Sequence, residues 1–240
     1  MLQLPLGVRL REASRFENFL TGPNATAVHA VKGMATASAA AVLWLWGTRG
    51  TGRSHLLQAT CASAGTLAKA SAYLPLAELA ALGPGVLAGL ETLSVVAIDD
   101  VDRVAGDADW ERALFNLYNA VTDGGASLIV AAAAPPAGVE WRLVDLASRF
   151  SAATVFHLRA LDYSDLPTAL QQRAALRGLE LPADSADFLL KRYPRDMHTL
   201  CIVLDTLDEA SLIAQRRLTV PFLKEVLERR QWIASDPAHR

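Results

Sequence analysis

The sequence lacks several features that would assign it to a class at once. It has only two cysteines, Cys61 and Cys201, and each lies in an apolar helical pattern. Such thiols are typical of buried residues in a reducing compartment and not of a disulfide framework. No uncharged apolar run is long enough to suggest a membrane span, and the N-terminus lacks the basic head and apolar middle of a secretion signal. We therefore expect a cytoplasmic protein without membrane contact.

Charge of one sign is also scarce. The 23 Lys and Arg residues nearly balance 25 Asp and Glu residues, which gives a formal net charge of -2. Because the basic residues are scattered, the sequence predicts no nucleic-acid-binding stripe, and any contact with DNA is expected to be indirect. With 240 residues, of which 52% are hydrophobic, the chain suits one ordinary domain with a real core and a small appendage.

Apolar runs of strand length alternate with helical patterns through the first two thirds of the chain. The predicted strands are residues 41–46, 73–76, 93–100, 126–132 and 154–158, and the predicted helices are 25–38, 54–62, 109–122 and 143–149. This alternation implies an α/β fold with a parallel sheet. Only helical patterns follow, at residues 163–177, 183–192, 195–215 and 220–232. We predict an α/β domain over residues 15–160, a small all-α domain over 161–232, and tails at 1–14 and 233–240.

A glycine-rich loop, GTRGTGRS at residues 47–54, joins the first predicted strand to a helix. The glycine spacing is that of a phosphate-binding loop, in which the backbone approaches phosphate oxygens and the helix N-terminus favours their charge. Arg53 replaces the usual lysine and is expected to reach the β and γ phosphates, while the Ser54 hydroxyl would bind Mg²⁺. The residues predicted to contact nucleotide here are Gly47, Thr48, Gly50, Thr51, Gly52, Arg53, Ser54 and His55. The alternative is a plain turn before a core helix.

Two carboxylates, Asp99 and Asp100, end the third predicted strand. Ligands of open α/β sheets bind at this carboxyl edge. We expect Asp99 to hold the Mg²⁺ shell and Asp100 to orient or deprotonate an attacking water. Since further acids follow at 102, 107 and 109, a solvated acidic loop is the alternative.

Two arginines are notable for their positions. Arg149 ends a short predicted helix, from which its guanidinium could project toward the nucleotide of a neighbouring protein. Arg195 begins a long predicted helix of the second domain and could swing over the phosphates when that domain closes. For either residue the alternative is a surface ion pair.

Several segments together resemble a known family over nearly the whole chain. They are RFENF at 15–19 with GPN at 22–24, GRSHLL at 52–57, IDD at 98–100, PP at 135–136, DLASRF at 145–150 and AQRRLTVPF at 214–222. These segments are similar to those of AAA+ initiators and, within that group, of the Hda proteins, which inactivate the replication initiator DnaA. The resemblance implies a P-loop AAA+ domain followed by a helical lid.

The same resemblance assigns roles to individual residues. Phe19 would lie on the adenine side of a bound ADP or ATP, with Mg²⁺ as the metal, and Arg195 would be the second sensor arginine. Arg149 matches the arginine finger, which would act in trans on ATP bound to DnaA. At the N-terminus, Gln3, Leu4 and Leu6 are similar to the motif by which Hda binds the sliding clamp, the β subunit of DNA polymerase III. A plain N-terminal strand or tail is the alternative for that motif.

One position departs from the pattern. After the fourth predicted strand, where initiators carry a polar sensor side chain, this chain has Ala133. Together with Arg53, this alanine predicts weak or absent ATP hydrolysis by the protein itself, with ADP as the more economical ligand.

The resemblance therefore implies a regulatory adaptor that binds the clamp, stimulates hydrolysis of DnaA-bound ATP and so limits re-initiation of replication. Such a protein would associate with the nucleoid through its partners. The sequence does not decide whether it forms a homodimer. The alternatives are a helicase loader of the same AAA+ group, for which a basic surface for single-stranded DNA would be expected, and a scaffold that has lost nucleotide.

Overall fold

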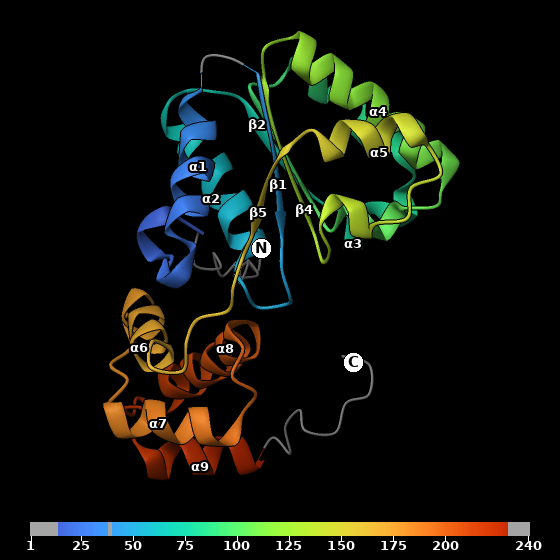
Figure 1. The fold of residues 1–240 in the computed structure, drawn as a ribbon. Helices are drawn as coiled ribbons and strands as arrows, with labels where there is room; N and C mark the ends of the chain where they lie inside the picture. Colours follow the sequence, from blue (N-terminus) through green and yellow to red (C-terminus); the bar gives the residue numbers. More distant parts are fainter. Residues whose placement is uncertain (1–13, 38–39, 230–240) are drawn as a thin grey trace, which may run out of the picture.

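A five-stranded parallel sheet forms the centre of the larger part of the molecule (Figure 1). The computed structural model describes residues 14–37 and 40–229. The sheet order is β2-β3-β4-β1-β5. The strands are β1 Ala41–Trp46, β2 Ser71–Pro75, β3 Val95–Asp99, β4 Ser127–Ala132 and β5 Thr154–His157. The predicted parallel α/β sheet is therefore confirmed.

Helices cover both faces of this sheet (Figure 1). The helices α1 (Ala25–Thr36) and α2 (Arg53–Thr66) lie on one face, and α3 (Leu76–Leu79), α4 (Ala108–Asp123) and α5 (Val144–Ser151) lie on the other. Side chains alternate along a strand, so Leu43 and Leu45 of β1 pack toward the first pair while Trp44 packs toward the second group. Every residue of β3 and β4 is buried, which explains why these strands read as continuous apolar runs.

The C-terminal helices form a separate core at one end of the sheet (Figure 1). They are α6 Leu166–Leu176, α7 Ala183–Arg192, α8 Met197–Ala214 and α9 Val220–Arg229. Leucines from all four helices pack together, among them Leu170, Leu189, Leu204 and Leu223.

Two of these helices start later than the sequence predicted. Helix α6 begins at Leu166, not at residue 163, with Pro167 in its first turn where a missing N–H costs nothing. Helix α8 begins at Met197, because the Asp196 carboxylate caps it by accepting a hydrogen bond from the Thr199 N–H at 2.8 Å. Arg195 therefore precedes the helix that it was predicted to begin.

The segment between β2 and β3 was not predicted. It contains α3 and the 3₁₀ helices Ala80–Leu82, Pro84–Leu87 and Leu90–Thr92. These turns are too short to show a helical period in the sequence. The second strand also lies earlier than expected, at residues 71–75, and Leu76 begins α3.

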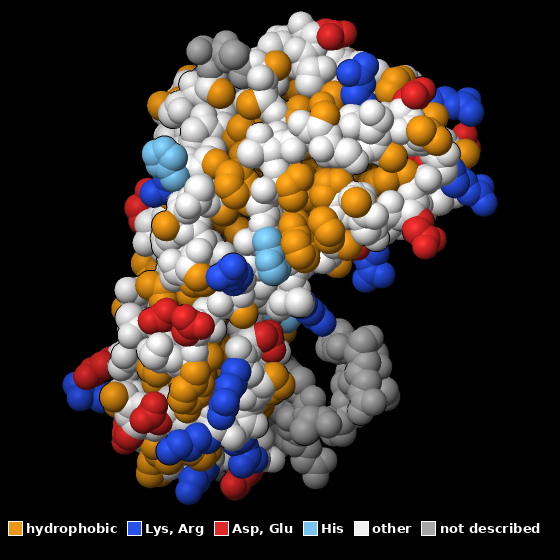
Figure 2. Space-filling view, in the orientation of Figure 1, with side chains coloured by type: hydrophobic (Ala, Val, Ile, Leu, Met, Phe, Trp, Pro, Cys, Tyr) orange, Lys and Arg blue, Asp and Glu red, His pale blue; other side chains and the backbone are white. Residues whose placement is uncertain are grey.

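The exposed surface carries charges of both signs. In Figure 2, acidic and basic side chains are interspersed over the helical part, whereas apolar side chains gather on the visible face of the α/β part. Within residues 14–37 and 40–229, no helix combines the length and apolar character needed to cross a membrane.

Candidate functional site

The loop between β1 and α2 has a conformation that its glycines make possible. Gly50 and Gly52 have φ angles of +85° and +96°, a region that side-chain-bearing residues rarely adopt. A Cβ atom on Gly47 would lie 2.5 Å from the Leu158 carbonyl oxygen, so this position admits no side chain. The Thr51 hydroxyl donates to the Thr48 carbonyl at 2.8 Å and closes the turn. The loop thus leads into the first turn of α2, whose N–H groups have no partner within the helix.

A buried carboxylate lies beside this helix start. Asp99, at the end of β3, is only 1% exposed. Its two oxygens accept hydrogen bonds from the Tyr73 hydroxyl at 2.9 Å and from the Asp100 N–H at 3.0 Å. Burial, followed by the adjacent Asp99 charge, raises the pKa of Tyr73. Tyr73 therefore holds the side chain of Asp99, one of the two residues predicted to bind Mg²⁺.

Arg53 makes a contact that the sequence did not predict. Its Nη2 lies 3.3 Å from Oδ1 of Asp100, whose own φ is +51°. Burial and the neighbouring Asp99 raise the pKa of Asp100, while Arg53 opposes that shift. The Nη1 atom of Arg53 is buried, and the described residues give it no hydrogen-bond partner. An unused buried cationic donor beside a glycine cradle fits an anionic group such as a phosphate.

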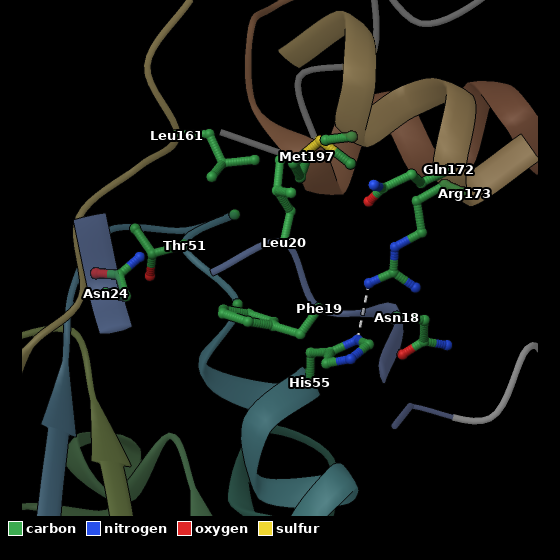
Figure 3. Close-up of a pocket in the computed structure, with 13 residues that line it drawn as sticks. Asn18, Phe19, Leu20, Asn24, Thr51, His55, Leu161, Gln172, Arg173 and Met197 are labelled. Carbon is green, nitrogen blue, oxygen red and sulfur yellow. Dashed lines mark hydrogen bonds between the residues drawn. The ribbon is translucent and has the colours of Figure 1, made fainter. Parts of the chain in front are cut away.

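A pocket lies between the loop and the helical part (Figure 3). Its lining combines apolar and polar residues from both parts of the chain, namely Asn18, Phe19, Leu20, Asn24, Gly50, Thr51, Gly52, His55, Leu161, Ala169, Gln172, Arg173 and Met197. The Phe19 ring lies against Gly52, where an added Cβ would be 2.4 Å from Cε2 of Phe19. Its centroid is 5.4 Å from that of His55. The pocket therefore offers flat aromatic and apolar walls next to the glycine-rich loop.

His55 connects three segments at this pocket. Its Nε2 is 2.8 Å from the Arg15 carbonyl oxygen, and its Nδ1 is 2.8 Å from Nη2 of Arg173 on α6 (Figure 3). A guanidinium only donates and a carbonyl only accepts, so the ring is neutral with its proton on Nε2. Burial, followed by the Arg173 charge, lowers the pKa of His55 to about 4. His55 thus ties the N-terminal segment, α2 and the helical part together.

Further contacts join the helical part to the loop and fix the chain segments around it. Nη2 of Arg49 lies 2.7 Å from Nε2 of His198, at the start of α8. The Asn24 side chain pairs with both the N–H and the carbonyl of Arg159, at 2.8 and 2.9 Å, and so fixes the chain between β5 and α6. The Arg195 guanidinium lies 4.4 Å from the centroid of the Tyr163 ring.

The remaining predicted site residues lie elsewhere. Arg149 is exposed on α5, and its guanidinium carbon lies 5.9 Å from the centroid of the Tyr118 ring. Ala133 is exposed directly after β4. Gln3, Leu4 and Leu6 lie outside the described residues.

Comparison with known proteins agrees with this geometry. Residues 164–227 match the family described as "Hda, lid domain". This segment is thus similar to the lid domain of the Hda family. The matched segment covers all four C-terminal helices except the last residues of α9.

Solved structures of similar fold align with most of the chain. Domain III of Thermotoga maritima DnaA aligns with a TM-score of 0.77 at 20% identity, over 92% of this chain and 98% of that one. Aquifex aeolicus DnaA bound to AMPPCP aligns at 0.69 and 21% identity, over 92% and 69% of the two chains. The Thermotoga maritima RuvB branch migration motor aligns at 0.61 and 18% identity, over 85% and 66%. The chain therefore has the fold of these proteins, and its C-terminal helices match the Hda lid family.

Several residues that line the pocket were not predicted from the sequence, among them Arg173 and Asn24. Arg173 lies 118 positions from His55, and nothing in the pattern of α6 sets it apart from a surface arginine. Asn24 was present in the quoted GPN segment, but its pairing with residue 159 needs the folded chain. A polar residue just before a predicted helix was the only available signal.

Proposed function

We propose that this protein is a nucleotide-dependent adaptor that stimulates hydrolysis of ATP bound to DnaA, in complex with the sliding clamp, and so restrains initiation of replication. The Hda lid supports the regulatory class. The observation that carries the trans role is Arg149, an exposed guanidinium on a helix whose other side is anchored by the buried residues Leu146 and Phe150. An arginine held in this way can reach a phosphate on a partner.

A nucleotide would bind across the loop and the pocket. Gly47, Gly50 and Gly52 allow the backbone to approach the phosphates, and Arg53 would turn part of its guanidinium toward them. Phe19 and His55 would contact the base, while Ser54 and Asp99 would hold Mg²⁺. Aquifex aeolicus DnaA, which has the same fold, was solved with AMPPCP. When bound, Mg²⁺ would neutralise charge on the phosphates.

The protein's own site is poorly equipped for hydrolysis. Asp100, the acid predicted to orient water, is engaged by Arg53. Ala133 has no polar atom on its side chain with which to contact a γ-phosphate or water. Binding without rapid turnover fits a subunit whose nucleotide controls shape while the hydrolysis occurs on DnaA.

The trans role is tested by measuring hydrolysis of radiolabelled ATP on purified DnaA with DNA-loaded clamp. We expect wild-type protein to accelerate it and Arg149→Ala to abolish the acceleration while DnaA binding persists. Arg112→Ala, which removes another exposed arginine from the neighbouring helix α4, is the matched control and should behave as wild type. Full stimulation by Arg149→Ala would remove Arg149 from the mechanism.

Clamp binding is tested separately on immobilised clamp. Gln3→Ala and Leu4→Ala should each weaken capture of the protein, because the glutamine sets the register and the leucine fills a pocket in such motifs. Unchanged capture would reopen the loader and scaffold alternatives.

A further inference from the structure

A fully buried carboxylate lies away from the nucleotide site. Glu111, on α4, is 0% exposed. Its Oε1 accepts hydrogen bonds from the Gly106 N–H at 2.7 Å and the Arg142 N–H at 3.1 Å, and its Oε2 accepts one from the Leu143 N–H at 2.6 Å. A buried charge is costly unless it is fully hydrogen-bonded, and three backbone donors satisfy this one.

The three donors belong to two loops that matter for the proposed function. Gly106 follows the 3₁₀ helix Val101–Val104, which itself follows Asp99 and Asp100 at the sheet edge. Arg142 and Leu143 directly precede α5, the helix that carries Arg149, and Leu143 is its N-cap residue. One carboxylate therefore joins the loop after the acidic pair to the start of the Arg149 helix.

Other contacts hold the rest of α5 against α4 and the sheet. The Phe150 ring packs against Trp44 of the sheet at 5.1 Å and edge-on against Tyr118 of α4 at 6.0 Å. Tyr118 also lies under the Arg149 guanidinium. Helix α4 thus fixes both ends of α5, because Glu111 holds the N-cap residue Leu143 and Tyr118 contacts residues near the last turn.

We propose that Glu111 is a positioning residue for Arg149. It sets where α5 begins, and it connects that helix to the loop that leaves the protein's own Asp99 and Asp100. The proposal rests on the trans role of Arg149. The charge matters because a glutamine would offer one oxygen to the three N–H groups and present an NH₂ group to at least one of them.

Glu111→Gln tests the proposal with the protein, DnaA and the DNA-loaded clamp together. We expect maximal stimulation to fall about tenfold or more, since small misplacement of a reacting group has effects of this size. The concentration for half-maximal stimulation should stay unchanged, because α5 remains exposed for binding. In an Arg149→Ala background, Glu111→Gln should cause no further loss.

A matched control separates positioning from general weakening of α4. Asp107 caps the same helix by accepting hydrogen bonds from the Asp109 and Trp110 N–H groups, at 3.0 and 3.2 Å, and those donors lie outside α5. Asp107→Ala should lower the melting temperature yet keep maximal stimulation. If both variants lose stimulation in proportion to stability, the positioning role is wrong.

Amide hydrogen exchange tests the positioning role on the protein alone, without DnaA or clamp. In wild-type protein the amides of residues 142 and 143 should be protected, and Glu111→Gln should speed their exchange together with that of the first turn of α5. Absence of stimulation by wild-type protein would overturn the trans role alone, whereas unchanged exchange in Glu111→Gln would overturn the positioning role alone.

Discussion

His55 is a neutral histidine held between a carbonyl and a guanidinium, and this has a consequence for stability. Its pKa is lowered to about 4, whereas an unfolded chain would have the ordinary value near 6.5. Above pH 6.5 the His55 side chain is neutral in both the folded and the unfolded state. Between pH 6.5 and 4 the unfolded state binds a proton that the folded state does not, so the folded state loses stability as the pH falls.

We expect this loss to reach about 2 kcal/mol at pH 5. Denaturant unfolding of wild-type protein and of His55→Gln at pH 7.5 and pH 5 measures it. The variant should lose less stability between the two pH values than wild type does. Equal losses would mean that His55 titrates normally in the folded protein.

The pairing of Arg53 with Asp100 places a carboxylate where phosphates would compete for the same cation. Replacing that carboxylate should strengthen nucleotide binding, because it frees the guanidinium and removes a negative charge. Asparagine is the suitable replacement, since it tolerates the left-handed backbone of residue 100.

Asp100→Asn should therefore bind ADP about fivefold more tightly than wild type, equivalent to roughly 1 kcal/mol for a partly exposed pair. Isothermal titration with ADP is the measurement, and Asp109→Asn, an exposed acid on α4, is the control. Weaker binding by Asp100→Asn would show that the carboxylate assists the nucleotide.

Among the elements, the glycine-rich loop packs closely against Phe19, the residue that follows the 3₁₀ helix Phe16–Asn18. Gly52 has a φ of +96° and leaves no space between its α-carbon and the Phe19 ring. The substitution Gly52→Ala would strain the loop and displace Phe19 from the pocket.

We expect Gly52→Ala to lose at least tenfold in ADP affinity and to lower the melting temperature. Gly65→Ala is the matched control, because this glycine lies in α2 with open space around it and an ordinary φ. It should leave binding unchanged and stabilise the helix by up to about 1 kcal/mol. Equal ADP affinity in the two variants would contradict the role of the loop.

The sequence predicted an element best where burial of that element alone determines its pattern of apolar residues. Strand β3 is buried on both faces, so its apolar run and terminal Asp99 could be recognised directly. The start of α8 could not be recognised in this way. Asp196 and not Arg195 caps the helix, and both are polar residues that precede an apolar pattern. The short helices between Leu76 and Thr92 carry no period at all.

The site was predictable in part for a similar reason. The glycines and the acidic pair have fixed spacing along the chain, and the fold places them together. The contacts of His55 with Arg173, and of Arg53 with Asp100, join segments far apart in sequence. Only the tertiary structure determines which arginine meets which partner.

Across the whole molecule, two contacts attach the helical lid to the glycine-rich loop and its neighbourhood. Arg49 of the loop contacts His198 of the lid, and Arg173 of the lid contacts His55 beside the loop. A nucleotide in the intervening pocket would touch both parts, so its binding should stabilise the whole protein.

Purified protein should therefore melt at a higher temperature with ADP, with a stabilisation of about 4 kcal/mol at a thousandfold excess over Kd. The same preparation should hydrolyse ATP slowly when alone, as Ala133 and the engaged Asp100 imply. Differential scanning calorimetry and a phosphate-release assay measure the two properties. Rapid turnover without a partner would contradict the adaptor role.

We propose above all that this protein completes the active site of another one. The most direct measurement is single-turnover hydrolysis of ATP prebound to DnaA, with DNA-loaded clamp and either wild-type protein or Arg149→Ala. We predict a large acceleration by wild type and none by the variant, at concentrations where both bind DnaA equally. Equal acceleration by the two, or none by wild type, would contradict the account.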